Sequence, residues 1–243
     1  ELPDWSLRAR QIHDAHLQSI LDELNRVDRR LLSTQSQLIA DVLKSRLTDH
    51  FETQVCQMWS WSVDQLGGPQ VWLAELPNYH RVDGLDRADA LITRYTLFGE
   101  FFRRHIENLR TGLRQRRIAA RINVERVVEQ LKQIVEQPVP GSPFVKPVID
   151  QMVERPKLSK AQYRDRLIAV VEKHVYPAFR QYLEFLQTEL LPKARTSVGI
   201  NALPEGNACY AARIHSYTGV RLTAAQIHRI GLNEVVRIHE EMK

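Results

Sequence analysis

Long stretches of this chain contain neither glycine nor proline. The first lies between Pro3 and Gly67, and the 243 residues include only 10 glycines. Apolar residues recur there at intervals of three and four, as on one face of a helix, rather than in the alternation of a strand. These features predict an essentially all-α fold of long antiparallel helices, with a little strand near residues 199–212.

Composition places the chain in the ordinary globular class. Hydrophobic residues make up 43% and charged residues 26%. The formal net charge of +5 is mild, because 29 acidic residues are interspersed with 34 basic ones. A nucleic-acid binder would concentrate its basic residues on one face. No run of 18 apolar residues is present, so we expect neither a nucleic-acid partner nor a transmembrane segment.

Residues 5–62 predict a helical hairpin. Helical spacing runs from Trp5 to Leu31, and Ser33 can cap a second helix from Thr34 to Trp61. The short break between the two helices implies an antiparallel pair.

Residues 63–191 predict a helical body. Gly67-Gly68-Pro69 ends the hairpin, and residues 64–84 are expected to be irregular. Three helices should follow: one over 87–113 capped by Asp86, one over 120–137, and one that begins with the Ser159–Gln162 capping box and reaches Leu190. Pro177 should kink that last helix or mark a junction of two.

Residues 192–243 predict a loop and a final helix. A turn-rich segment precedes Thr223-x-x-Gln226, a second capping box. The helical pattern reaches Lys243 without a Gly or Pro stop, and the chain starts at Glu1 without Met, so we expect a piece of a longer protein. A leader before Glu1 would have been removed or left out.

The histidines do not form a zinc-binding pattern in sequence. His13 and His16 share a helix face but have no third ligand nearby. His228 and His239 are about 16 Å apart along a helix, too far to share an ion. His239-Glu240 resembles the start of a zinc helix, but Lys243 stands where the second His is required. We therefore expect no metal ligand in the chain, no stoichiometric zinc, and no peptide hydrolysis by the chain alone.

The arginines and the cysteines could each indicate another function. Arginines at 103, 110, 114, 117 and 121 could line one helix face and meet phosphates, but no aromatic residues interleave with them, which favours a solvated face. Cys56 and Cys209 lie far apart, have no metal-type spacing and leave the redox compartment open. Nucleophile-elbow, phosphate-loop and dinucleotide-loop patterns are missing from the sequence.

The segment from Leu203 to Tyr217 contains the candidate substrate-binding residues. Pro204 and Gly206 predict a loop between two long helices, where a scaffold presents groups to a ligand. Tyr210 offers a ring and a hydroxyl, while Arg213 and His215 could meet a peptide's carboxylate or carbonyl. The equally weighted alternative is that Gly206 only permits a turn and Tyr210 fills core. The candidate substrate-binding set is Gly206, Tyr210, Arg213 and His215, with no catalytic residue.

Four parts of the chain share a pattern with one protein family: Asp64–Val71 with Leu76-Pro77, Val124–Leu131, Val198–Gly206 with Tyr210, and Leu222–Val235. Through them, most of the chain beyond about residue 60 resembles the bacterial proteins grouped as domain of unknown function 885. One departure is Cys209, which stands where the family usually has the first of two aromatic residues.

The resemblance implies a function. The family is similar to helical zinc metallopeptidases, often exported or lipid-anchored, with a His-Glu-x-x-x-x-His-His zinc helix well downstream. The chain would then be the amino-terminal half, forming one wall of a gluzincin-type substrate cleft. Its partners would be the carboxy-terminal remainder of the same protein and a peptide substrate. The protein would be located in the cell envelope or periplasm. The cofactor would be a zinc ion bound by residues outside this chain. The alternative is a non-catalytic helical binding or structural module of the envelope.

Overall fold

The computed structural model describes residues 2–153 and 159–243, and the described residues contain helices and no β-strand. An isolated β-bridge pairs Ala120 with Arg195. The all-α prediction is thus confirmed. The little strand expected near residues 199–212 is wrong, because the 3-10 turn Ile200–Ala202 and a helix beginning at Gly206 occupy that stretch.

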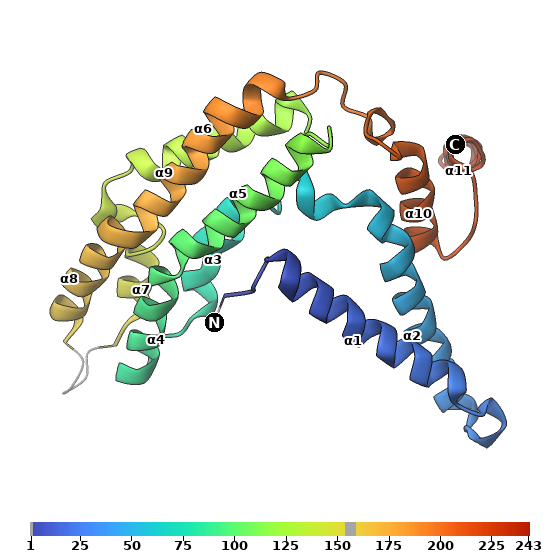
Figure 1. The fold of residues 1–243 in the computed structure, drawn as a ribbon, viewed down its shortest axis with the longest axis horizontal. Helices are drawn as coiled ribbons and strands as arrows, with labels where there is room; N and C mark the ends of the chain where they lie inside the picture. The colour runs from blue at the N-terminus through green and yellow to red at the C-terminus, as the bar shows by residue number, and fades with distance from the viewer. Residues whose placement is uncertain (1, 154–158) are drawn as a thin grey trace. The chain divides into compact units, whose positions relative to one another are not determined.

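The chain folds as two compact units (Figure 1). Unit 1 comprises Glu1–Ala9 and Trp59–Val198, and unit 2 comprises Arg10–Met58 and Gly199–Lys243. Unit 2 is therefore assembled from two segments that are far apart in sequence. Among the described helices, none is long and apolar enough to cross a membrane.

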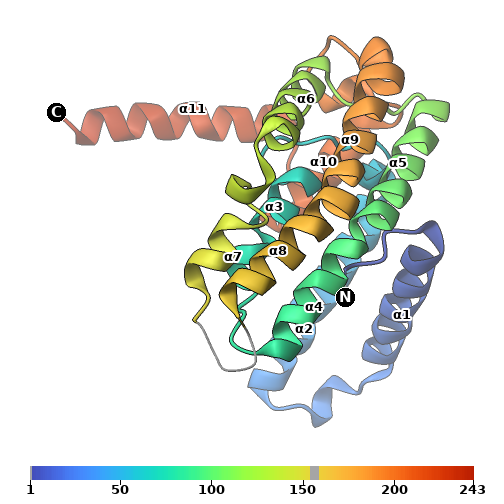
Figure 2. The same ribbon diagram turned by 90° about the vertical axis from the view of Figure 1, so that its left-hand side faces the viewer.

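The described residues of unit 1 form seven α-helices, with short 3-10 turns and two π-helical segments. Its α-helices are α3 (Pro69–Tyr79), α4 (Leu85–Thr96), α5 (Phe98–Arg114), α6 (Arg121–Glu136), α7 (Lys146–Gln151), α8 (Lys160–Val170) and α9 (Tyr176–Phe185). Figures 1 and 2 show α9 running alongside α5 and α6, and these pairs make the closest contacts between α-helices of the unit.

The core of unit 1 is aromatic. The Phe102 ring stacks on Tyr182 at 5.0 Å between centroids and meets Phe179 edge-on at the same distance. The buried Tyr95 hydroxyl donates to the Phe144 carbonyl oxygen at 2.9 Å. Tyr163 likewise donates to the Ala88 carbonyl at 3.0 Å. The rings fill the interior while their polar ends keep hydrogen-bond partners.

The predicted helix from Ser159 to Leu190 contains two wide turns. Ser159 accepts a hydrogen bond from the Gln162 amide, as the cap predicts. π-helical segments occupy Val171–Val175 and Leu186–Leu190. Pro177 lies in the first turn of α9, directly after the first segment, so the predicted junction is confirmed. Buried residues in α8 and the first π-helical segment recur every four positions. In a regular α-helix, residues four positions apart point in directions that differ by about 40°. A π-turn has more residues per turn, so it keeps these side chains on one face.

Three expectations for residues 64–114 are wrong. Residues 69–79 form α3, because Gly68 caps it and Pro69 occupies its first turn, where a missing amide costs nothing. Gly84 rather than Asp86 is the cap of α4. The single helix expected over 87–113 is divided at Leu97 into α4 and α5.

The arginine stripe is also divided. Arg103 pairs with Glu100 and Glu107 on α5, and Arg110 pairs with Glu189. Helix α5 ends at Arg114, and the left-handed backbone of Arg116 turns the chain before Arg117 and Arg121. The five residues therefore do not share one continuous helix face.

Unit 2 contains four α-helices. These are α1 (Leu7–Arg26, of which residues up to Ala9 belong to unit 1), α2 (Thr34–Thr53), α10 (Gly206–Thr218) and α11 (Ala224–Glu241). Ser33 caps α2 by accepting from the Ser36 amide, and Thr223 and Gln226 form both bonds of the capping box of α11. These caps match the sequence-based predictions, and α1 and α2 lie within residues 5–62, where the sequence predicts a helical hairpin. Neither α1 nor α11 has a buried residue.

Replacing Gly112 with alanine should destabilise unit 1 strongly. A Cβ at this position would lie 1.9 Å from the Ser60 carbonyl oxygen. Gly99, on the same helix, has nothing within 4 Å and provides a matched control. We expect Gly112→Ala to lower the free energy of unfolding by about 2 kcal/mol or more, because backbone must move, and Gly99→Ala to be neutral or stabilising by up to about 1 kcal/mol. Urea denaturation followed by tryptophan fluorescence measures both, and equal effects would contradict the prediction.

Unit 1 should also lose stability in mild acid. Complete burial lowers the pKa of His105 to about 4, while the same side chain in an unfolded chain titrates near 6.5. Between these values the unfolded chain binds the extra proton, so stability rises with pH there and is lost as pH falls from about 6.5 toward 4. We expect a slope approaching about 1.4 kcal/mol per pH unit and a total loss of about 3 kcal/mol. Denaturation at several pH values should show a flatter profile in His105→Leu, while exposed His228→Gln keeps the original slope.

Candidate functional site

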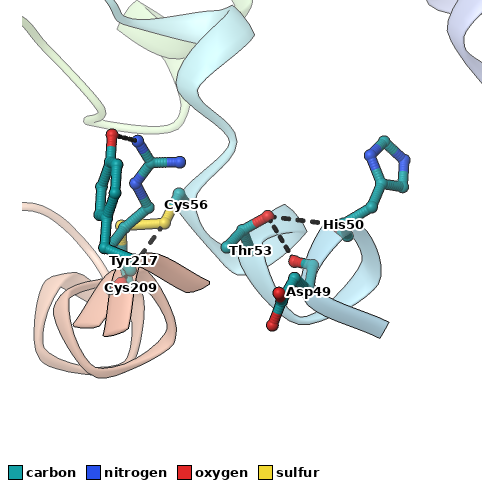
Figure 3. The surroundings of a disulfide bond; sticks show 7 residues. Asp49, His50, Thr53, Cys56, Cys209 and Tyr217 are labelled. Atoms are coloured by element: carbon teal, nitrogen blue, oxygen red, sulfur yellow. Dashed lines mark hydrogen bonds between the residues drawn. A yellow bond between two sulfur atoms is a disulfide. The ribbon is translucent and has the colours of Figure 1, made fainter. Parts of the chain in front are cut away.

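The candidate site lies within unit 2, where α2 packs against α10. A disulfide joins Cys56, just after α2, to Cys209 in the first turn of α10, and both cysteines are buried (Figure 3). Farther along α10, His215 faces Asp49 and Glu52 on α2. Later residues of α10 thus meet earlier residues of α2, so the two helices are antiparallel.

Local backbone chemistry sets where α10 begins. Glu205 caps the helix in the left-handed region, with φ of 56°. Gly206 follows, and a Cβ there would lie 2.1 Å from the Ile200 carbonyl oxygen. Gly206 therefore permits close approach of two backbone segments, while Glu205 makes the turn.

The predicted loop from Leu203 to Tyr217 is wrong, because α10 occupies most of it. The sequence Asn207–Arg213 includes three alanines and no glycine or proline, so it favours a helix once Gly206 is passed. Pro204 remains outside the helix, before its cap.

The structure separates the four predicted substrate-binding residues. Gly206 is buried at the helix start. Tyr210 is 49% exposed. Arg213 lies on the same face as Tyr210 and Tyr217, because these positions are three and four residues apart. Its guanidinium donates a hydrogen bond to the Tyr217 hydroxyl and lies 4.6 Å from the centroid of that ring. His215 is two residues farther on and points instead toward α2.

His215 completes a cluster with two carboxylates. Its Nδ1 atom is 3.2 Å from Asp49 Oδ1 and 3.2 Å from Glu52 Oε2. One donor atom from each residue lies within 4.8 Å of the others, the only such group of three found among the described residues. Asp49 is 8% exposed, whereas His215 and Glu52 are partly exposed.

Arg221 sets the charge of Glu52. Its guanidinium donates to Glu52 Oε1 at 2.6 Å, leaving Oε2 toward His215. This hydrogen bond is the largest influence on Glu52 and lowers the pKa of its carboxyl, although partial burial acts in the opposite direction. Glu52 is therefore ionised at neutral pH, and the cluster is acidic on its α2 side.

Local sequence patterns could not reveal this cluster. Asp49 and Glu52 have the i, i+3 spacing of a shared helix face, but no histidine lies at the spacing along the sequence that would complete a metal site with both. His215 is on a different helix, far along the chain. The disulfide was missed for the same reason, although two cysteines in a chain expected to be exported were a usable signal.

The His239-Glu240 sequence does not fit a zinc site. Both residues lie on α11 and are exposed, and Lys243 follows where a second imidazole would be required. The His239-Glu240 pair therefore does not supply the two ligands of a peptidase zinc helix.

The Asp64–Gln70 part of the family-like motif has a structural role in unit 1. The Asp64 carboxylate accepts from the Leu66 and Gly67 amides. The buried Gln70 amide donates to the Asp64 carbonyl oxygen at 2.8 Å and to Gln130 on α6 at 3.0 Å. These bonds fix the turn before α3 and tie it to α6, along a groove of about 360 Å³ that includes Gln133 and Gln137.

Comparison with known proteins gives a family and a fold. A family model described as "Bacterial protein of unknown function (DUF885)" matches residues 1–243. A solved structure described as that of "the putative lipoprotein from Colwellia psychrerythraea" is similar over 100% of this chain, with 22% identity and a TM-score of 0.86. The match covers 43% of that protein, so this chain spans less than half its length. At this identity the likeness shows the fold. No curated protein matches.

Removing the disulfide should destabilise unit 2 selectively. Its cysteines are 153 residues apart, and the loop-closure entropy for that length sets an upper bound of about 5 kcal/mol. All four tryptophans lie in unit 1. We expect Cys56→Ala/Cys209→Ala to move part of the helical circular dichroism transition to lower urea while the tryptophan transition stays in place. Reduction of the unmodified chain should have the same effect, and a thiol assay should find no free thiol before reduction.

Proposed function

Because the chain belongs to the bacterial family of unknown function DUF885, we propose that it is the amino-terminal helical part of a larger exported protein. In the complete protein this part lines the substrate cleft of a zinc-dependent peptidase. The family match and the helical fold support its assignment as a helical part of a larger protein. The peptidase assignment extends the resemblance of the sequence to helical metallopeptidases.

The disulfide is the observation that supports export. Cys56 and Cys209 account for every cysteine in the chain, and both are used in the bond. Structural disulfides persist in the bacterial periplasm and at cell surfaces, and are rare in reducing compartments. The cell envelope is therefore the proposed location, in agreement with the lipoprotein description of the structural relative.

Exposed apolar residues on α11 support the presence of further protein. None of its residues is buried, and five of its large apolar side chains are at least 44% exposed: Ile230, Leu232, Val235, Val236 and Ile238. Met242, just beyond the end of the helix, is exposed as well. In Figure 2 α11 extends away from α10 with no other helix of unit 2 along it. Many exposed large apolar side chains on one helix favour a covering partner. The proposed occupant is the remainder of the same protein, since the structural relative extends well beyond the matched 43%.

Helix α10 supplies the proposed substrate contacts. Tyr210 presents a half-exposed ring, and Arg213 is held by Tyr217 through a hydrogen bond and ring contact. A guanidinium with a fixed orientation loses less freedom when it binds a carboxylate or carbonyl oxygen. In this proposal Arg213 orients the peptide, while Tyr210 packs its ring against the peptide and donates a hydrogen bond to it from its hydroxyl.

The zinc ion of such a peptidase would polarise the scissile carbonyl and activate water. Its ligands would come from outside this chain, so residues 1–243 would bind and orient substrate without performing the reaction. The chain alone is expected to hydrolyse no peptide, and the complete protein is expected to do so in a chelator-sensitive manner. A complete protein that lacks such activity would favour a non-catalytic envelope module.

The Tyr210→Phe change tests the cleft assignment in the complete protein. It keeps the ring and removes only the hydroxyl. We expect kcat/KM for peptide hydrolysis to fall about tenfold, equivalent to about 1.4 kcal/mol of transition-state stabilisation, with an unchanged melting temperature. Tyr79→Phe, which changes an exposed tyrosine of unit 1, is the control and should leave both values as they are. Unchanged kcat/KM in Tyr210→Phe would show that the hydroxyl has no role in the cleft.

A further inference from the structure

We propose that Asp49, Glu52 and His215 form a binding site for a divalent transition-metal cation such as Zn²⁺. The site lies within unit 2 and joins α2 to α10. It is independent of the proposed peptidase zinc and of the family resemblance. It also replaces the expectation, drawn from sequence spacing, that the chain has no metal ligand.

The distances suit a small cation. With metal–ligand bonds of about 2.0–2.2 Å in a tetrahedron, neighbouring donor atoms lie about 3.3–3.6 Å apart. His215 Nδ1 is 3.2 Å from one oxygen of each carboxylate, and the three donors lie within 4.8 Å of one another. Glu52 is partly exposed, so its side chain can rotate slightly. Such a rotation would bring its Oε2 atom into one coordination shell with Asp49 Oδ1 and His215 Nδ1.

The buried donor atoms have no hydrogen bonds. Asp49 Oδ1 and His215 Nδ1 are both buried, and neither makes a hydrogen bond to any group. They are 3.2 Å apart, but neither carboxylate oxygen lies where a ring N–H could donate to it. Buried polar atoms are rarely left in this condition. A cation between them would satisfy both atoms, with the carboxylate oxygens flanking the imidazole nitrogen.

Neighbouring groups leave these donor atoms available. The Thr53 hydroxyl donates to the Asp49 backbone carbonyl and not to its carboxylate, as Figure 3 shows. Arg221 binds the other oxygen of Glu52. Two carboxylate groups outnumber the one guanidinium beside them, which favours a cation between them.

The donor set indicates the class of ion. Calcium and magnesium prefer shells made only of oxygen, whereas an imidazole nitrogen with two carboxylates suits zinc, cobalt or manganese. Three protein ligands leave a fourth position for water or for another group. The ion would link α2 and α10 at a second point, on the opposite side of Thr53 from the disulfide.

The test is a titration of the chain with Co²⁺, a spectroscopic substitute for Zn²⁺, without reducing agent so that the disulfide stays closed. The visible absorption band of bound cobalt reports its ligands, and calorimetry with Zn²⁺ gives stoichiometry and Kd. The variants are Asp49→Asn, Glu52→Gln and His215→Gln. Asp22→Asn on α1 and His228→Gln on α11, both exposed, are the matched controls.

We expect one ion per chain and a Kd at least about tenfold weaker in each of the three variants, with the controls unchanged. Circular dichroism checks that each variant is folded. Glu52 is the least buried of the three, so Glu52→Gln decides the matter if either other variant unfolds.

Three results would overturn the proposal. The unmodified chain could bind no stoichiometric metal. Binding could survive in the folded variants. Alternatively, His50→Gln could abolish binding while His215→Gln does not, which would assign the ion to the neighbouring group of His13, Asp14 and His50.

Discussion

The covalent bond between Cys56 and Cys209 is the constraint on which unit 2 depends. This unit is made from two distant segments, and its buried residues are few: Leu47, Asp49, Cys56, Leu203, Gly206, Cys209 and Ile214. Such a small core contributes little hydrophobic stabilisation, and small cores of this kind are commonly supplemented by disulfides or metal ions. The bond keeps α2 and α10 together and thereby places His215 beside the two carboxylates of α2.

Unit 1 is stabilised in a different way. It has no cysteine, and its interior is filled by interlocking aromatic rings from α4, α5, α9 and the segment around Phe144. The buried tyrosine hydroxyls in that interior have specific partners, such as that of Tyr95 with the Phe144 carbonyl. His105 approaches the Tyr182 hydroxyl at 3.3 Å and stays neutral at physiological pH because it is completely buried. The two units therefore respond to different conditions: one to acid, the other to reduction.

Local signals in the sequence predicted much of the fold. Ser33, Ser159 and Thr223 identified helix starts correctly, because a cap depends on residues within one turn. Cap and stop signals are misleading where one residue type can serve at either end of a helix. The Gly67-Gly68-Pro69 sequence predicts the end of a helical hairpin, but Pro69 is the first residue of α3. Asp86 was taken as a cap, although Gly84 two residues earlier has that role.

The candidate site was predictable only in part, and for a physical reason. His215 was selected from its side-chain chemistry, but its partners Asp49 and Glu52 become its neighbours only through the packing of α2 on α10. Nothing in the local sequence encodes that contact. Tyr210 and Arg213 share a helix face, a relation that spacing alone would have given if the segment had been predicted as a helix rather than a loop.

The π-turn at Val171–Val175, which lies between α8 and α9, also restricts how the length of this region can change. A π-turn is equivalent to one inserted residue in an α-helix. Losing that residue would restore regular winding and rotate every following side chain by about 100° relative to the preceding ones. Phe179 and Tyr182 would then turn away from Phe102, with no change in composition. Residues 171–175 can therefore tolerate substitutions more easily than a single deletion, because the rotational phase of α9 is set by residue count.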